Sequence, residues 1–68
     1  MELQVGDLVR RLEQPEILGT VTMVGVTENG SQVCEVIINY NKLFPENIGT
    51  TRYLNQCYWK KLVPKTNY

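Results

Sequence analysis

The side chains that usually carry out acid–base or nucleophilic catalysis are sparse in this chain. It contains no histidine, so the usual general base near neutral pH and any Ser-His or Cys-His nucleophile are missing. Glu13 and Glu16 are the best pair of carboxylates, but they flank Pro15 in a loop-like segment and we expect them to be solvated. Gly25 and Gly30 stand too far apart to form a phosphate-binding loop. We therefore expect a protein that is not an enzyme and that uses no cofactor.

The two cysteines offer little metal or redox chemistry. Cys34 and Cys57 are too few to complete a zinc site in a chain without histidine. A disulfide between them stays open, because geometry decides whether one forms. The first four residues lack the basic and apolar regions of a secretory signal. We therefore expect a cytoplasmic protein with two reduced thiols, Cys34 in the core and Cys57 near the surface.

Side chains suited to binding concentrate in the second half of the chain, where aromatic and basic residues alternate. The candidate binding residues are Tyr40, Phe44, Arg52, Tyr53, Tyr58, Trp59 and Lys60. The four rings other than Trp59 are candidates for a cage around a methylated ammonium group. Basic residues interleaved with aromatic ones also suit single-stranded nucleic acid. The simpler interpretation is that one or two rings fill the core and the others cover its rim.

The charge balance argues against bulk phosphate binding. Seven basic residues offset seven acidic ones, whereas a protein that neutralises many phosphates carries excess positive charge. Lys60 and Lys61 are adjacent in a predicted strand and therefore point to opposite faces. The same applies to Arg10 and Arg11. We expect these side chains to be solvated surface charges.

Length and composition indicate one small globular domain over residues 1–68. A chain of 68 residues buries only about 60% of its unfolded surface and rarely gains more than ~3–5 kcal/mol from its core. Self-association would add buried surface. Hydrophobic residues make up 43% and charged residues 21%, and no apolar run reaches the ~20 residues that a membrane span needs. We therefore expect no membrane interaction.

The apolar pattern predicts five short strands, over residues 7–12, 20–27, 32–40, 51–54 and 59–63, with a tail at 64–68. Ile17 and Leu18 are placed inside or next to the preceding loop, where we expect them to cover one end of the core. In the second strand the apolar face switches from that of Val21 and Met23 to that of Val24 and Val26. This switch indicates a bulge or strong coiling near Val24 and Gly25. Asn29-Gly30 predicts a type I′ hairpin.

The third predicted strand carries the core face, which comprises Cys34, Val36, Ile38 and Tyr40. The following loop, residues 41–50, is long for a hairpin and contains Leu43, Phe44 and Ile48. These residues either cover the mouth of the barrel or form a contact patch for another chain, and we favour the contact patch. Residues 55–58 predict one turn of 3₁₀ helix.

An all-β chain of this length must curl its sheet to enclose a core, which predicts a small five-stranded barrel. Four segments resemble SH3-like barrels of the Tudor and KOW type: Val-Gly-Asp-Leu-Val-Arg at 5–10, Gly-Thr-Val-Thr-Met-Val at 19–24, Cys-Glu-Val at 34–36 and Tyr-Trp-Lys-Lys-Leu-Val at 58–63. Such barrels often begin with Gly-Asp, start their second strand with Gly-x-Val and end in a short turn before a last strand with Leu. The resemblance covers residues 5–63.

Together these observations predict a non-catalytic binding module. The leading hypothesis is protein–protein interaction, or a small homo-oligomer, through the face formed by the 41–50 loop, Tyr53, Tyr58 and Trp59. The alternative is a nucleic-acid-binding accessory protein of the KOW or Tudor-like type, using Arg52 and Lys60. A small enzyme assembled only as an oligomer is a third hypothesis.

Overall fold

The computed structural model describes residues 3–62, which form five antiparallel strands and two short 3₁₀ helices. The strands are β1 (Leu8–Arg11), β2 (Ile17–Val26), β3 (Gln32–Asn41), β4 (Thr51–Asn55) and β5 (Trp59–Lys61), and the helices are η1 (Pro45–Asn47) and η2 (Gln56–Tyr58). The all-β prediction and the predicted 3₁₀ turn are confirmed. Val63 and the predicted tail at 64–68 lie outside the described residues.

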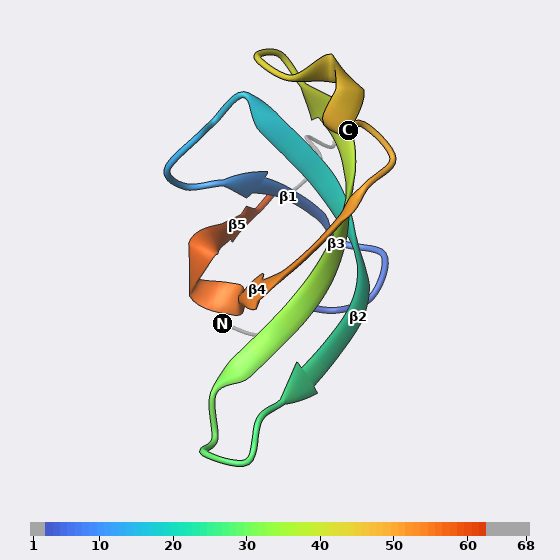
Figure 1. Cartoon of the computed structure of the whole chain (residues 1–68). Helices are drawn as coiled ribbons and strands as arrows, with labels where there is room; N and C mark the ends of the chain where they lie inside the picture. Colours follow the sequence, from blue (N-terminus) through green and yellow to red (C-terminus); the bar gives the residue numbers. More distant parts are fainter. Residues whose placement is uncertain (1–2, 63–68) are drawn as a thin grey trace, which may run out of the picture.

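All five strands belong to one sheet in the order β4-β3-β2-β1-β5. Within residues 3–62 no ladder of hydrogen bonds joins β4 to β5, so the sheet is not closed. β2 and β3 form a long twisted hairpin that runs the length of the molecule, and β1 and β5 lie beside one another on one side of it (Figure 1). The chain enters β1 through Gly6, at φ +94°, whose N–H donates to the Val21 carbonyl at 2.8 Å.

Two bulges set which side chains of the central hairpin face the core. Val21 pairs with Val36 but Met23 pairs with Glu35, so Thr22 is an extra residue on β2. Because side chains alternate along a strand, this extra residue places Met23 on the face opposite Val21. The prediction that these two residues share a face is therefore wrong, and the bulge lies at Thr22 rather than near Val24 and Gly25.

The second bulge lies at Asn39 of β3. Gly19 pairs with Ile38 and Leu18 pairs with Tyr40, so Asn39 has no partner in the ladder. The shift turns Tyr40 outward, with 47% of its surface exposed, and turns Asn41 inward. The prediction that Tyr40 belongs to the core face is wrong for this reason.

The start of β2 also differs from the prediction. Ile17 pairs with Asn41, so Ile17 and Leu18 belong to the strand and not to the preceding loop. Ile17 packs against the core cluster from this position.

The hairpin between β2 and β3 has a three-residue loop and not the predicted type I′ turn. Among the described residues, only glycines have positive φ, and Gly30 is at +86°. The Gly30 N–H donates to the Thr27 carbonyl, and the Thr27 N–H donates to the Ser31 carbonyl, both at 2.9 Å. A turn closed by a left-handed glycine is the usual form of such a loop, so Asn29 needs no left-handed conformation.

The core is formed by residues of β1, β2, β3 and β5 together with Leu3. Its buried members are Leu3, Val9, Val21, Cys34, Val36, Ile38 and Trp59. Gln56 of η2 is also buried: its Oε1 accepts the Leu3 N–H at 2.9 Å, and its Nε2 donates to the Val33 carbonyl at 3.3 Å. This one side chain therefore ties the N-terminal segment and β3 to η2.

The cysteines lie where the sequence predicted. Both are free, Cys34 buried and Cys57 exposed.

Candidate functional site

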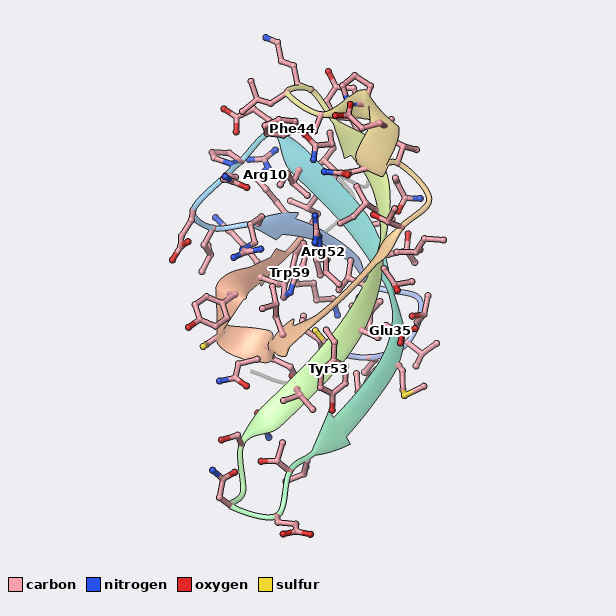
Figure 2. All side chains as sticks on the ribbon, in the orientation of Figure 1. Arg10, Glu35, Phe44, Arg52, Tyr53 and Trp59 are labelled. Carbon is pink, nitrogen blue, oxygen red and sulfur yellow. The ribbon has the colours of Figure 1, made fainter. Side chains whose placement is uncertain are left out.

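The loop between β3 and β4 presents apolar side chains to solvent. We define the loop surface as Tyr40, Leu43, Phe44 and Ile48, whose side chains are 47%, 60%, 52% and 47% exposed. The apolar side chains of the 41–50 loop are therefore exposed rather than folded over the core, and their role as a contact patch stays a prediction. Figure 2 shows the loop with Phe44 at one end of the molecule, far along the hairpin from Glu35 and Tyr53.

The backbone of this loop is fixed at both ends although its side chains are exposed. Asn41 is 3% exposed, and its Oδ1 accepts the N–H of Leu43 at 3.2 Å and that of Phe44 at 2.9 Å. Gly49, at φ +89°, donates its N–H to the Ile38 carbonyl at 2.8 Å. The exposed apolar residues are therefore held on an anchored segment.

The predicted aromatic cage does not form. Tyr53 of β4 pairs with Glu35, whereas Tyr40 pairs with Leu18. These positions are five residues apart on β3, about 16 Å at the rise of a strand. Tyr58 lies in η2, beside Arg11. The cage prediction fails because strand register, which local sequence does not reveal, separates the rings.

Trp59 is a buried member of the core cluster. It is 5% exposed, and the Arg11 guanidinium carbon lies 5.7 Å from its ring and 5.6 Å from the ring of Tyr58. Stacking of this kind favours one orientation of the guanidinium. Within residues 3–62, the buried Nε atom of Arg11 and the buried Nε1 atom of Trp59 have no hydrogen-bond partner.

The candidate basic residues occupy different faces. Lys60 of β5 is exposed and pairs with Arg10 of β1, which in turn pairs with Leu18. Leu18 pairs with Tyr40, so these four residues form a row across the outer face. Arg52 instead pairs with the buried core residue Val36. The sequence did not single out Arg10, because its place beside Lys60 depends on the pairing of the first and last strands.

Lys61 is engaged in an ion pair. Its Nζ lies 3.5 Å from a carboxylate oxygen of Asp7. Unlike Lys60, it is partly buried, as expected for adjacent residues of a strand.

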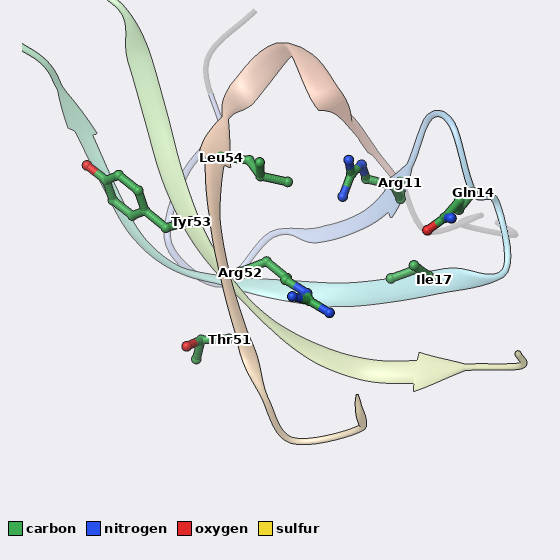
Figure 3. A pocket seen from close by; sticks show the side chains of 7 residues that line it. All are labelled: Arg11, Gln14, Ile17, Thr51, Arg52, Tyr53 and Leu54. Atoms are coloured by element: carbon green, nitrogen blue, oxygen red, sulfur yellow. The ribbon is translucent and has the colours of Figure 1, made fainter. Parts of the chain in front are cut away.

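A hollow of about 340 Å³ lies between β4 and the loop that joins β1 to β2. Its lining residues are Arg11, Gln14, Ile17, Thr51, Arg52, Tyr53 and Leu54. Figure 3 shows Arg52 and Leu54 extending from β4 toward Ile17 and Arg11, while Thr51 and Tyr53 point the other way. We call this hollow the arginine pocket. Sequence reasoning missed it because β4 and the β1–β2 loop are distant in the chain.

Comparison with known proteins does not assign the chain to a family. No protein-family profile, curated protein or solved structure matches the chain. Within residues 3–62, no group of three or more cysteine, aspartate or glutamate side chains is placed to hold a metal ion. No helix in that described range has the length and apolar character to cross a membrane.

Proposed function

We propose that this chain is a non-catalytic protein-interaction module on an SH3-like barrel, and that it associates with a second copy of itself through the loop surface. The strand order β4-β3-β2-β1-β5 and the 3₁₀ helix before β5 support the assignment to SH3-like barrels. The Gly-Asp and Gly-x-Val signals support the Tudor and KOW type within them.

The observation that carries the proposal is the exposure of the loop surface on an anchored backbone. A flexible loop would lose conformational entropy on binding, whereas a loop held by Asn41 and Gly49 has already lost much of it. Apolar surface removed from water contributes about 25 cal/mol per Å². Four half-exposed apolar side chains therefore favour burial against a matching surface, and a second copy offers the same surface in a two-fold arrangement.

Light scattering after size-exclusion chromatography tests this proposal. The measured mass should rise from 7.8 kDa toward twice that value as the protein concentration increases. Leu43→Ser should keep the protein monomeric to higher concentration. Leu12→Ser is the matched control, because Leu12 is 54% exposed but lies in the loop after β1. A mass that stays at the monomer value at every concentration would contradict the proposal.

Nucleic-acid binding is the second candidate, and one observation favours it. Lys60 and Arg10 are direct cross-strand neighbours. Two like charges in this position repel each other, and a bound anion would offset the repulsion. The row that they form on the outer face continues through Leu18 to the ring of Tyr40. Binding of a single-stranded oligonucleotide should then weaken with salt and be lost with Lys60→Glu. An absence of binding at low salt removes this candidate.

A further inference from the structure

The arginine pocket brings two guanidinium groups to one hollow from segments that are far apart in the sequence. Arg11 comes from the end of β1 and Arg52 from β4, and Figure 3 shows both side chains reaching into the space between these elements. No aspartate or glutamate is among the residues that line the pocket. The lining is therefore positively charged although the chain as a whole is neutral.

The charge of Arg52 has no acidic partner among the residues that the structure describes: no acidic side chain of residues 3–62 lies within ion-pair distance of Arg52. Its register position, opposite Val36 and on the same side of the sheet as Leu54, is one where an apolar residue would extend the core. An arginine at this position adds no such apolar contact and places a cation in the lining of the arginine pocket.

Arg11 is held in place but its charge is only weakly paired. Its single acidic neighbour among the described residues is Glu13, at 3.9 Å, and the Glu13 side chain is 69% exposed. An exposed pair at that distance contributes little to stability. The rings of Tyr58 and Trp59 restrict the guanidinium, so a ligand would meet a donor that is already oriented.

The uncharged part of the lining indicates what else the ligand carries. Ile17 and Leu54 are half-buried and pack against the core cluster, so they form an apolar base beside the two guanidinium groups. Gln14 adds an amide. A phosphate backbone presents repeated charges and needs a line of cations, but Lys60 and Arg10 lie on the outer face. One carboxylate with apolar neighbours fits this lining better.

We propose that the arginine pocket binds the carboxylate of a glutamate or aspartate in an acidic, partly apolar peptide segment. Arg11 and Arg52 would donate to the two carboxylate oxygens, and Ile17 and Leu54 would contact the flanking apolar side chain. The pocket shares no residue with the loop surface. This inference therefore stands apart from the proposed self-association, and each can fail without the other.

Titration of the ¹⁵N-labelled protein with peptides at low salt tests the inference. The probes are N-acetylated, C-amidated Gly-Leu-Glu-Leu-Gly and the same peptide with glutamine in place of glutamate. The glutamate peptide should shift the amide resonances of Arg11, Gln14 and Arg52, and the glutamine peptide should bind about tenfold more weakly or not at all. Arg52→Gln should weaken binding of the glutamate peptide by a similar factor.

Lys60→Gln is the matched control, because it removes one positive charge on the other face of the sheet. The Lys60→Gln variant should bind the glutamate peptide with the same affinity as the unaltered protein. Equal binding of the two peptides, equal losses in the two variants, or no binding would overturn the inference. Tighter binding of oligothymidine than of the glutamate peptide at the same residues would also overturn it, because the pocket would then serve nucleic acid. Arg52 is exposed, so Arg52→Gln is expected to fold, and its amide spectrum checks this.

Discussion

The side-chain Oδ1 of Asn41 accepts the backbone N–H of Phe44 at 2.9 Å. Asn41 is buried, whereas Phe44 is 52% exposed. The bulge at Asn39 turns Asn41 inward and thereby supplies an acceptor beneath the start of the loop. A buried polar residue thus determines where an exposed apolar residue is displayed.

Replacement of Asn41 should affect both stability and association. In Asn41→Ala, the Leu43 and Phe44 N–H groups lose their acceptor, which should lower the free energy of unfolding by about 1–3 kcal/mol. The loop surface should also lose its fixed shape, so association should weaken. Urea unfolding and light scattering measure the two effects. Lys42→Ala, at the exposed neighbouring position, should change neither, and a fully stable, fully associating Asn41→Ala would show that the loop needs no such anchor.

Gly19 is expected to tolerate no side chain. A Cβ atom there would clash with Val36 and would lie 2.6 Å from the Ile37 carbonyl oxygen, so Gly19→Ala should lower the free energy of unfolding by about 2–3 kcal/mol or more. Gly25→Ala is the control in the same strand, because its Cβ would meet only Val33 at 3.9 Å. Thermal unfolding should separate the two variants clearly. Similar melting temperatures would mean that β2 and β3 lie further apart at Gly19.

Replacement of Gln56 by alanine should destabilise the protein far more than replacement of its neighbour Asn55. Gln56→Ala leaves the buried Leu3 N–H without the acceptor that lies at 2.9 Å, which should cost about 1–3 kcal/mol. Asn55 is exposed and its side chain makes no capping bond to η2, so Asn55→Ala should cost little. Hydrogen exchange at the Leu3 amide adds a direct check. Unchanged protection of that amide in Gln56→Ala would be inconsistent with the bond.

The two thiols should differ strongly in reactivity. Cys34 is 1% exposed, and burial raises the pKa of its thiol above the ordinary value of 9.0, so both access and thiolate formation are suppressed. In the folded protein, iodoacetamide should modify Cys57 alone. Cys34 should react only after denaturation, and Cys57→Ser should remove the reaction under native conditions. Rapid native labelling of Cys34 would contradict its place in the core.

Local patterns were sufficient to predict the parts of the fold that depend on neighbouring residues. The Pro15 loop, the position of β4, the 3₁₀ turn at 56–58 and the apolar alternation of Cys34, Val36 and Ile38 are confirmed. Each rests on the backbone preference of a few residues or on a period of two along one strand. The sequence left open whether Leu43 covers the core or faces solvent, and the structure shows it 60% exposed.

The features that the sequence did not predict depend on how strands pair. The bulges at Thr22 and Asn39 arise from the register between β2 and β3, and they decide the faces of Met23 and Tyr40. Lys60 meets Arg10 only because β5 pairs with β1. The arginine pocket likewise needs the β1–β2 loop and β4 to line one hollow. Strand register and the meeting of distant segments are set by contacts between residues far apart in the chain, which a single sequence does not display.

The central proposal, self-association through the loop surface, is tested most directly by amide chemical shifts measured across a dilution series. We expect the resonances of residues 40–48 to move with concentration, and those of the β2–β3 turn at 28–31 to stay constant. Phe44→Ser should abolish the movement while the rest of the spectrum remains that of the folded protein. Shifts that do not change with concentration, or that change at another face, would contradict the proposal.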